Sequence, residues 1–490
     1  MSGSGSVTVP GATGVVTVTL GTGDVLHLAS AIGALLATIQ GAGNLSLTTA
    51  SIGSIPPAPA VSAPTVTDLN IVGNVSGGAA TIPSGYQYVV DVNTLPSTIT
   101  SSGGVLITGT AGGSFNVTGV NTVAATGGNN SITAIGEYVV STGDGNETVS
   151  ATGYGTVATD LGHSLISVTG YNQVLSIGQD TVLAGVGLTT VSSSGSDSEI
   201  VGSSAAGALL YVSLTGSQST VAPSDSDSSI TVAGSSDLVF GGIAISDVIV
   251  SGTADTIVGG AGPVAVTTST NPVIFGGTGP ISFVGGAGTA TIVGGSGGTE
   301  TATVGSGGLL FSSNAANAAA LNTATITGGA GTTTVFGASN GDVNFVGNQA
   351  GGIFVGFGGN ETLNASGSSS FNIFSAGVGG NVSLVGGSGD DTFFAGSGAA
   401  TMSGGAGVNA FAFFDGSTGG HDYITDFTPT DSLYLIGYSS SQTAAGLLAA
   451  ATVDSSGVTL TLSDTTKITF TNLTSASQLN GDILYGPKPT

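Results

Sequence analysis

The sequence lacks cysteine entirely and has only two basic residues, Lys467 and Lys488. Without cysteine, the chain can form neither disulfides nor thiolate metal sites. Charged residues account for 6% of the 490 positions, and the formal net charge is −25. Because so few basic side chains are available to neutralise phosphates, we exclude nucleic acid as a partner and expect no attraction to anionic membranes.

Long apolar runs and catalytic groupings are also missing. No stretch of about eighteen apolar residues occurs, so we expect no insertion into a membrane. The N-terminal MSGSGSVTVPGATG lacks the basic and apolar regions of a conventional secretion signal. His27, His163 and His421 are too far apart in sequence to share a metal-ligand spacing. The G-x-S-x-G match at residues 294–298 lies inside a glycine repeat, so we expect no enzyme.

Glycine, by contrast, is abundant, and its spacing predicts the fold. Glycine pairs begin at Gly276, Gly285 and Gly294, nine residues apart, and each opens a unit that ends in a short apolar strand, as in GGTGPISFV. This repeat of a glycine turn and a short strand is typical of a β-solenoid. We therefore predict an all-β chain built as a parallel β-solenoid, of the β-roll or β-helix type, with roughly two such units per turn.

Changes in composition along the chain predict five segments. Residues 1–55 are an N-terminal segment that caps the solenoid or drives assembly, with two strands around Pro10 and a helix over residues 27–40. Next come a proline-rich linker at 56–65, an irregular β-solenoid at 66–249 and a glycine-pair β-roll at 250–416. We predict that residues 417–490 form a C-terminal cap and secretion-signal region, with a short helix at 443–451 followed by antiparallel strands.

One nonapeptide is distinctive because it carries a carboxylate. Residues 386–394, GGSGDDTFF, fit the pattern G-G-x-G-x-D-x-U-x, with Asp391 at the acidic position and Phe393 at the inward apolar one. Carboxylate and carbonyl oxygens are the ligands that Ca²⁺ prefers. The chain here resembles the RTX (repeats-in-toxin, haemolysin-type) family, and the resemblance extends over the glycine-pair region and the C-terminal segment, roughly half of the chain.

The resemblance implies bound Ca²⁺, held by acidic or amide side chains on neighbouring repeats. The candidate ligands are Asp391, Asp390, Asn409, Asp415, Asp422 and Asp426, with degenerate copies of the motif at Glu147, Glu361 and Asp255. The alternative is that these acids are solvated turn residues. Since Ile281 and Ala290 replace the acid in consecutive units, we expect local calcium sites rather than calcium-driven folding of the whole solenoid.

The C-terminal segment carries a second part of the resemblance. Residues 420–427, GHDYITDF, and residues 431–435, DSLYL, resemble the element that follows the repeats in the RTX family. In that family an uncleaved C-terminal signal directs type I secretion in one step. The resemblance therefore implies an extracellular or cell-surface location.

Two classes of function remain open. We expect a secreted structural protein that assembles with itself into an extracellular filament, surface layer or matrix, because no toxin, protease or lipase module accompanies the repeats. Solenoid ends expose strand edges, and residues 7–20 are our candidate for strand addition between copies. The alternative is a Ca²⁺-dependent adhesin or a carbohydrate-binding module that recognises cell-surface polysaccharide.

Aromatic and threonine patterns bear on these alternatives. The 28 Phe and Tyr residues lie mostly at strand positions that we expect to face inward, which argues against an aromatic carbohydrate-binding surface. Pairs of threonines at 289/291, 301/303, 323/325 and 332/334 resemble the arrays of solenoid ice-binding proteins. Ice binding and a polysaccharide-acting enzyme are the less favoured alternatives.

Overall fold

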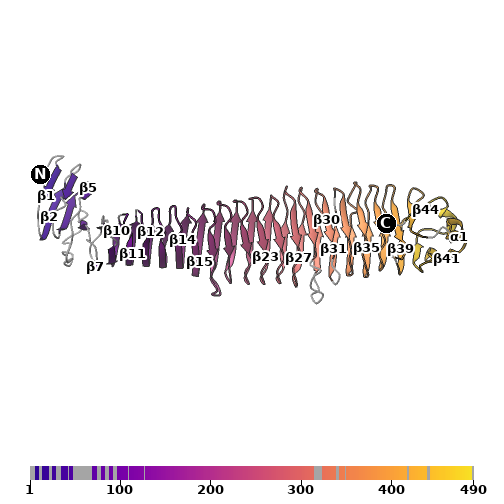
Figure 1. Cartoon of the computed structure of the whole chain (residues 1–490), viewed down its shortest axis with the longest axis horizontal. Helices are drawn as coiled ribbons and strands as arrows, with labels where there is room; N and C mark the ends of the chain where they lie inside the picture. Colours follow the sequence, from indigo (N-terminus) through magenta and orange to yellow (C-terminus); the bar gives the residue numbers. More distant parts are fainter. Residues whose placement is uncertain are drawn as a thin grey trace. The chain divides into compact units, whose positions relative to one another are not determined.

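The structure of the chain is a computed structural model (Figure 1). It describes the backbone of strands β1 to β8 between residues 6 and 91, and all residues from 97 to 487 except 109, 126, 314–322, 338–340, 348, 417–418 and 439–441. Nearly all of the described secondary structure is β, in about 18 stacked parallel turns. The prediction of an all-β parallel β-solenoid is confirmed. The chain forms two compact units, residues 1–230 and residues 231–490.

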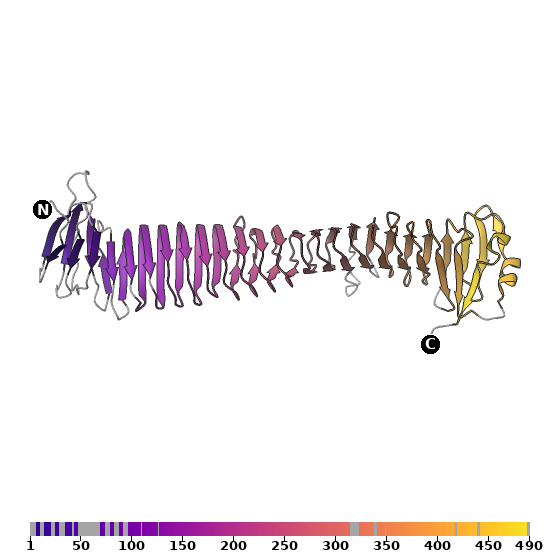
Figure 2. The ribbon, with the colours of Figure 1, turned by 90° about the horizontal axis from the view of Figure 1, so that it is seen from above.

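Unit 1 contains five long parallel strands, each of which pairs with the next one in sequence. They are β11 (Gly113–Ala125), β12 (Asn130–Ser141), β13 (Thr148–Ala158), β14 (Leu165–Ser176) and β15 (Thr181–Ser193). Ser131 pairs with Thr148, and Thr148 pairs with Leu165, so the turn repeats every 17 residues. The prediction that residues 66–249 form an irregular solenoid is therefore wrong for these strands, which are longer than most strands of unit 2 (Figure 2).

A column of glycines explains how these long strands follow the solenoid around a corner. Gly119, Gly136, Gly153, Gly170 and Gly187 lie in register on successive strands, and all have positive φ between 91° and 129°. A Cβ atom at Gly153 would lie 2.1 Å from the carbonyl oxygen of Gly136. Only glycine fits both the backbone conformation and this close approach between turns.

The interior of unit 1 is filled mainly by β-branched residues in register. One column consists of Val123, Val140, Val157, Val174 and Val191, all with no solvent exposure. The burial patterns of these strands alternate on each side of the glycine corner, as expected when one face of a strand packs inward. Outward positions include Tyr154 and Tyr171, which are 61% and 55% exposed and stack with ring centroids 5.1 Å apart.

The N-terminal strands also pair in parallel, apart from one antiparallel junction. β1 (Ser6–Val9) pairs with β3 (Val25–Leu28), which pairs with β5 (Asn44–Leu47). β2 (Gly14–Leu20) pairs with β4 (Leu35–Gly41), which pairs antiparallel with β6 (Leu69–Gly73). The two strands predicted around Pro10 are confirmed, whereas the proline-rich linker at 56–65 lies outside the described residues.

The helix predicted over residues 27–40 is wrong. His27 and Leu28 belong to β3, and Leu35 to Gln40 belong to β4. The apolar residues there have a spacing compatible with a helix, but seven register pairs join β4 to β2. Pairing with a neighbouring strand thus overrides a helical pattern that is weakened by Gly33, Thr38 and Ile39.

The remaining strands of unit 1 continue the stack on both sides of the long ones. They are β7 (Ala79–Ile82), β8 (Tyr88–Asp91), β9 (Ser97–Ser101), β10 (Gly104–Thr108), β16 (Glu199–Val201), β17 (Leu209–Leu214) and β18 (Thr220–Ala222). β15 pairs with both β16 and β17, because the single long strand is replaced by two short strands per turn.

Unit 2 has two short strands per turn, which form two interleaved parallel ladders. The odd-numbered ladder comprises β21 (Ser246–Val250), β23 (Val264–Thr268), β25 (Ile281–Val284), β27 (Thr299–Thr303), β29 (Thr323–Thr327), β31 (Asp342–Val346), β33 (Asn360–Asn364), β35 (Asn381–Val385), β37 (Ala399–Ser403) and β39 (His421–Ile424). The even-numbered ladder comprises β20 (Leu238–Phe240), β22 (Thr256–Val258), β24 (Val273–Phe275), β26 (Ala290–Val293), β28 (Leu309–Ser312), β30 (Thr333–Phe336), β32 (Gly352–Val355), β34 (Ile373–Ser375), β36 (Thr392–Phe394), β38 (Ala410–Phe414) and β40 (Ser432–Ile436). The prediction of two glycine-pair units per turn is confirmed.

Phenylalanine fills the interior of unit 2. Seventeen of the eighteen phenylalanines lie after residue 230. Phe354, Phe374, Phe393 and Phe411 stack in register with centroid distances of 5.1, 4.8 and 4.9 Å, and all are fully buried. The predicted inward position of Phe393 is confirmed. The same prediction is wrong for several tyrosines, which lie on outward strand positions of both units.

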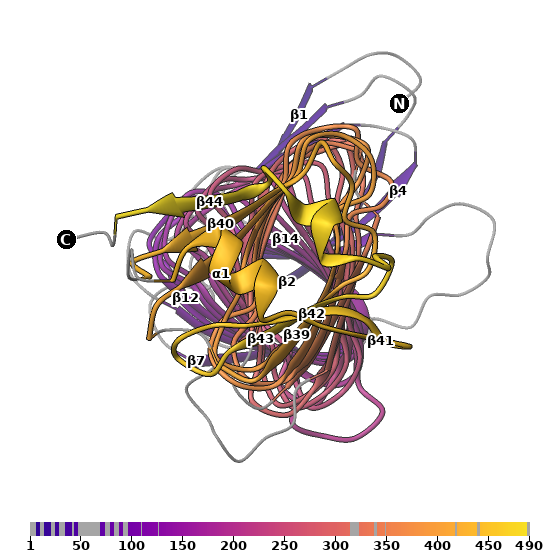
Figure 3. The same cartoon turned by 90° about the vertical axis from the view of Figure 1, so that its right-hand side faces the viewer.

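The C-terminal cap closes both ladders of unit 2. β41 (Thr452–Asp454), β42 (Gly457–Thr461) and β43 (Lys467–Phe470) form an antiparallel meander, and β43 also pairs in parallel with β39. β44 (Ile483–Gly486) pairs in parallel with β40. The predicted short helix is confirmed as α1 (Ala444–Ala449), capped by the Thr443 side chain, and it lies across the end of the stack with the 3-10 helix η1 (Ala476–Leu479) nearby (Figure 3). No helix in the described residues is long and apolar enough to cross a membrane.

Candidate functional site: polar columns at the turns and a polar groove

A column of inward polar residues lies at one corner of unit 2, directly before the even-numbered strands. Asn372, Asp391, Asn409 and Asp431 occupy this position on successive turns, and each is at most 2% exposed. Polar side chains of this kind are buried only when they find hydrogen-bond partners. The column contains two predicted calcium ligands, Asp391 and Asn409.

The members of this column bond to each other through the backbone. The N–H of Asn372 donates to Asp391 Oδ1 at 2.8 Å, the N–H of Asp391 donates to Asn409 Oδ1 at 2.9 Å, and the N–H of Asn409 donates to Asp431 Oδ1 at 2.8 Å. Each side chain thus accepts from the backbone of the turn before it. The bond extends strand pairing by one residue at a corner where backbone N–H groups would otherwise be buried without an acceptor.

The Asp391 carboxylate accepts three hydrogen bonds. Besides the Asn372 N–H, its Oδ1 accepts from Asn372 Nδ2 at 2.8 Å, and its Oδ2 accepts from the Gly387 N–H at 2.8 Å. Burial raises the pKa of Asp391, and these hydrogen bonds work in the opposite direction. The acid of the nonapeptide therefore holds the glycine turn of its own unit and the start of the strand before it.

Unit 1 has an equivalent column made of other residue types. Asn130, Glu147, Ser164 and Asp180 lie in register and are buried. Ser164 Oγ donates to Glu147 Oε2 at 2.9 Å, and the Ser164 N–H donates to Asp180 Oδ1 at 2.8 Å. Burial raises the pKa of Glu147, while hydrogen bonds from Ser164 and Asn130 lower it. The predicted ligand Glu147 therefore occupies the same structural role as Asp391.

Two of the degenerate motif copies and Asp422 are likewise buried. Asp255 Oδ1 accepts from the Asp237 N–H at 3.0 Å, and both carboxylate oxygens of Glu361 accept from the Phe357 N–H, at 3.1 and 3.0 Å. Asp422 lies on β39, in the other ladder from Asp391, and is fully buried. Its Oδ1 accepts from the Ala400 N–H at 2.9 Å, whereas its Oδ2 has no partner in the described part of the chain.

The remaining predicted ligands lie closer to the surface. Asp390 is exposed and accepts from the Val408 N–H at 2.8 Å. Asp426 is half-buried and accepts from Ser403 Oγ at 2.6 Å and from the N–H groups of Gly404 and Gly405 at 2.8 Å each. Asp415 is half-buried as well. The structure thus joins Asp391 to Asn409 directly but does not bring all six ligands of the 386–426 cluster together.

The donor sets around these carboxylates bear on whether Ca²⁺ fits them. Asp391, Asp426 and Glu361 are approached by N–H or O–H groups, whose positive ends point at the oxygens that a cation would need. A calcium site requires six to eight oxygen ligands around one point. Within the described ranges, no three acidic or histidine side chains converge in this way. In this conformation the arrangement suits a structural hydrogen-bond column better than a cation, and the calcium sites stay a prediction.

The sequence contained a signal for the column that motif matching missed. Asn372, Asp431, Ser164 and Asp180 do not belong to a complete nonapeptide, yet they continue columns that include Asp391 and Glu147. Successive members of the unit 2 column are 19, 18 and 22 residues apart, close to twice the glycine-pair period. Reading the position before each strand every second unit would have found them.

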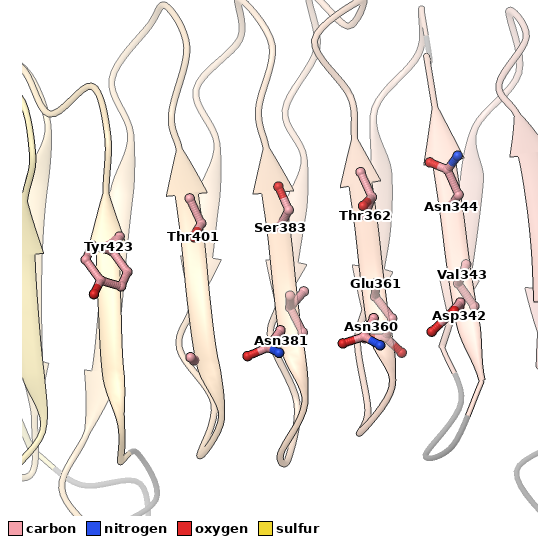
Figure 4. Close-up of a pocket in the computed structure, with 12 residues that line it drawn as sticks. Asp342, Val343, Asn344, Asn360, Glu361, Thr362, Asn381, Ser383, Thr401 and Tyr423 are labelled. Carbon is pink, nitrogen blue, oxygen red and sulfur yellow. The ribbon is translucent and has the colours of Figure 1, made fainter.

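A shallow groove runs across the outward face of the odd-numbered ladder in unit 2. It measures about 620 Å³ and crosses β31, β33, β35, β37 and β39. One row of its lining contains Asn344, Thr362, Ser383, Thr401 and Tyr423, in register on successive strands. A second row contains Asp342, Asn360, Asn381 and Ala399 (Figure 4). The lining therefore offers amides and hydroxyls, one exposed carboxylate and one aromatic ring.

The threonine pairs that resemble an ice-binding array do not share one face. Thr301 and Thr303 are adjacent to Thr325 and Thr327 on the odd-numbered ladder, whereas Thr291 and Thr334 lie on the even-numbered one. The outward threonines continue into the mixed rows of the groove, where amides and Tyr423 replace them. The pattern is a polar face of varied side-chain size rather than a uniform array.

Comparisons with known proteins add no relative. No family model, no curated protein and no solved structure matches this chain. The resemblance to the RTX family thus depends on the motifs at residues 386–394 and 420–435 alone.

Proposed function

We propose that this chain is a secreted structural protein that assembles with itself at the cell surface or outside the cell. The observation that carries the proposal is the pairing of the first two strands. Within the described residues, β1 pairs only with β3 and β2 pairs only with β4, so each has one edge with no partner strand. An edge strand of this kind is a template for a strand from another chain.

The composition of these strands supports the proposal. β2 reads GVVTVTL and β1 reads SVTV, and the first charged residue of the chain is Asp24. Natural sheets usually protect an edge strand with lysine or another charged residue, or with proline. β1 and β2 contain none of these residues. In unit 2, the last strand of each ladder has a partner in the C-terminal cap, because β39 pairs with β43 and β40 pairs with β44. Assembly through the N-terminal edge, with the cap preventing uncontrolled growth at β39 and β40, agrees with this asymmetry.

The test places positive charge on β2 and, as a control, on a strand that has partners on both sides. The double variant Thr17→Lys/Thr19→Lys adds two lysines to β2, and Ser131→Lys/Thr133→Lys adds two lysines at outward positions of β12, which has partners on both sides. We expect the wild type and the β12 variant to form polymers seen by negative-stain electron microscopy and sedimentation velocity, and the β2 variant to stay monomeric. Polymers of unchanged length from the β2 variant would exclude strand addition at this edge.

A further inference from the structure

The groove on the odd-numbered ladder has a shape that follows from side-chain size. Asn344 and Tyr423 lie at its two ends, and the lining between them consists of strand side chains that include the small residues Thr362, Ser383, Ala399 and Thr401. Figure 4 shows Tyr423 at one end of a row of outward side chains that starts at Asn344 on β31. The hollow is therefore produced by the sequence of these strands and not by a loop.

The lining is chemically suited to a ligand rich in hydroxyl groups. The side chains of Asn344, Asn360 and Asn381 make no hydrogen bond within the described part of the chain, so their donors and acceptors face solvent. The lining contains carboxylates but no basic side chain, and the whole chain has a net charge of −25. An anionic ligand would be repelled, whereas a neutral ligand with alternating donors and acceptors would not.

The repeat of the rows indicates a long ligand. Polar groups recur on each of five successive strands, and a spacing of about 4.8 Å between strands gives a row of roughly 19 Å. A small molecule would contact only part of this row. A polymer lying across the strands would meet an equivalent polar group at every turn.

Tyr423 supplies an aromatic surface that is held in place. Its ring stacks on the His421 ring with centroids 4.4 Å apart, and Nε2 of His421 lies 2.7 Å from Thr469 Oγ1. A ring fixed in this way loses little conformational entropy when a ligand packs against it. Tyrosine combines an apolar ring, suited to the C–H face of a sugar, with a polar hydroxyl.

We propose that this groove binds a neutral polysaccharide chain that lies across strands β31 to β39. In unit 1, a second polar groove of about 450 Å³ has a similar lining of hydroxyls and amides, including Ser114, Ser131, Asn129 and Asn146. The proposal does not depend on self-assembly through β2, and the monomeric Thr17→Lys/Thr19→Lys variant should bind polysaccharide as the wild type does.

The experiment uses matched substitutions on the two ladders. Tyr423→Ala and Thr362→Leu alter the groove, while Tyr434→Ala and Thr392→Leu make the same changes at outward positions of the even-numbered ladder. Each variant is run by affinity gel electrophoresis in hydroxyethylcellulose, in galactomannan and in polygalacturonate. Circular dichroism checks that each variant retains the wild-type spectrum.

We expect a neutral polymer to retard the wild type and both control variants, and polygalacturonate to retard none of them. Each groove variant should raise the Kd for the neutral polymer at least tenfold. Absence of retardation in both neutral polymers, or equal loss in groove and control variants, would overturn the proposal. The proposal would also be overturned if the wild type showed no glycan affinity but inhibited ice recrystallisation, and the groove variants abolished that inhibition. That result would assign the face to ordered water.

Discussion

Asp391 and Asn372 are joined twice across one turn of unit 2, because Asp391 Oδ1 accepts from both the backbone N–H and the side-chain amide of Asn372 at 2.8 Å. The same carboxylate also accepts from the Gly387 N–H of its own glycine turn. A residue that the sequence predicted as a metal ligand therefore connects two consecutive turns through hydrogen bonds. This role can be separated from metal binding by experiment.

Removing the Asp391 carboxylate should destabilise its turn. Asp391→Ala leaves three buried N–H donors without an acceptor, and at about 1–3 kcal/mol for each unsatisfied group we expect a loss on the order of 3–9 kcal/mol. Hydrogen exchange of the Asn372 and Gly387 amides should accelerate accordingly. Asp390→Ala, at the exposed neighbour, should change stability by less than about 1 kcal/mol. Similar exchange rates in the two variants would contradict the column as a source of stability.

Chelation should have little effect if the column alone holds these turns. The oxygens of Asp391 and Asp426 already accept N–H and O–H groups, so removing calcium with EGTA should leave the thermal unfolding midpoint within about 2 °C of that in excess Ca²⁺. Differential scanning calorimetry in both buffers measures this. A large rise of the midpoint with Ca²⁺, lost in Asp391→Asn, would instead establish the predicted calcium site and require a different local conformation.

Asp422 should make unit 2 more stable in acid than at neutral pH. Burial raises the pKa of Asp422 to about 7, and the hydrogen bond from Ala400 lowers it only in part. The ordinary pKa of an aspartate in an unfolded chain is about 3.9, so the folded state holds the extra proton between these values. Its contribution is fully present below about pH 4 and is lost at roughly 1.4 kcal/mol per pH unit up to pH 7.

The measurement for Asp422 is the free energy of unfolding in urea at pH 5 and at pH 8. Asp422→Asn should abolish the part of the pH slope that this carboxyl contributes and should make the protein more stable than the wild type at pH 8. Asp390→Asn, which changes an exposed carboxylate, serves as the control and should leave the slope near that of the wild type. If Asp422→Asn retained the full slope, another buried acid such as Glu300 would be responsible.

The glycine column of unit 1 should tolerate substitution only at its first member. Gly119 and Gly153 both have positive φ, of 91° and 129°, but a Cβ at Gly119 would have no atom within 4 Å, whereas one at Gly153 would lie 2.1 Å from the Gly136 oxygen. We expect Gly119→Ala to cost about 1–2 kcal/mol from backbone conformation alone. Gly153→Ala should cost more than about 3 kcal/mol, measured by urea unfolding, and equal losses would show that turn spacing adjusts easily.

The sequence predicted the fold of unit 2 well because the pattern that indicates it, a glycine pair followed by a short strand, is local. Each glycine pair and the strand after it fit within nine residues, so GGTGPISFV and GGAGTATIV can be interpreted without knowing their neighbours. The antiparallel cap was predicted for the same reason, since alternation in β42 and β43 is visible within each strand.

Unit 1 and the polar columns could not be read in the same way because their signals are long-range. Single glycines 17 residues apart, such as Gly136 and Gly153, become meaningful only when the strands are stacked. Whether Glu147 or Asp391 faces solvent or the interior depends on the turn above it, which no nine-residue window contains. The helix predicted over residues 27–40 failed for a related reason, because the partner strand β2 lies outside that window.

The uneven distribution of phenylalanine gives unit 2 an optical signature of its own. The chain has no tryptophan, so its near-ultraviolet circular dichroism comes from tyrosine and phenylalanine alone. The stacked rings of Phe374 and Phe393 report on unit 2, and the parallel pair Tyr154 and Tyr171, with planes 2° apart, reports on unit 1. Because seventeen of the eighteen phenylalanines lie in unit 2, whereas tyrosines occur in both units, the phenylalanine bands follow the melting of unit 2 in the intact, unlabelled chain.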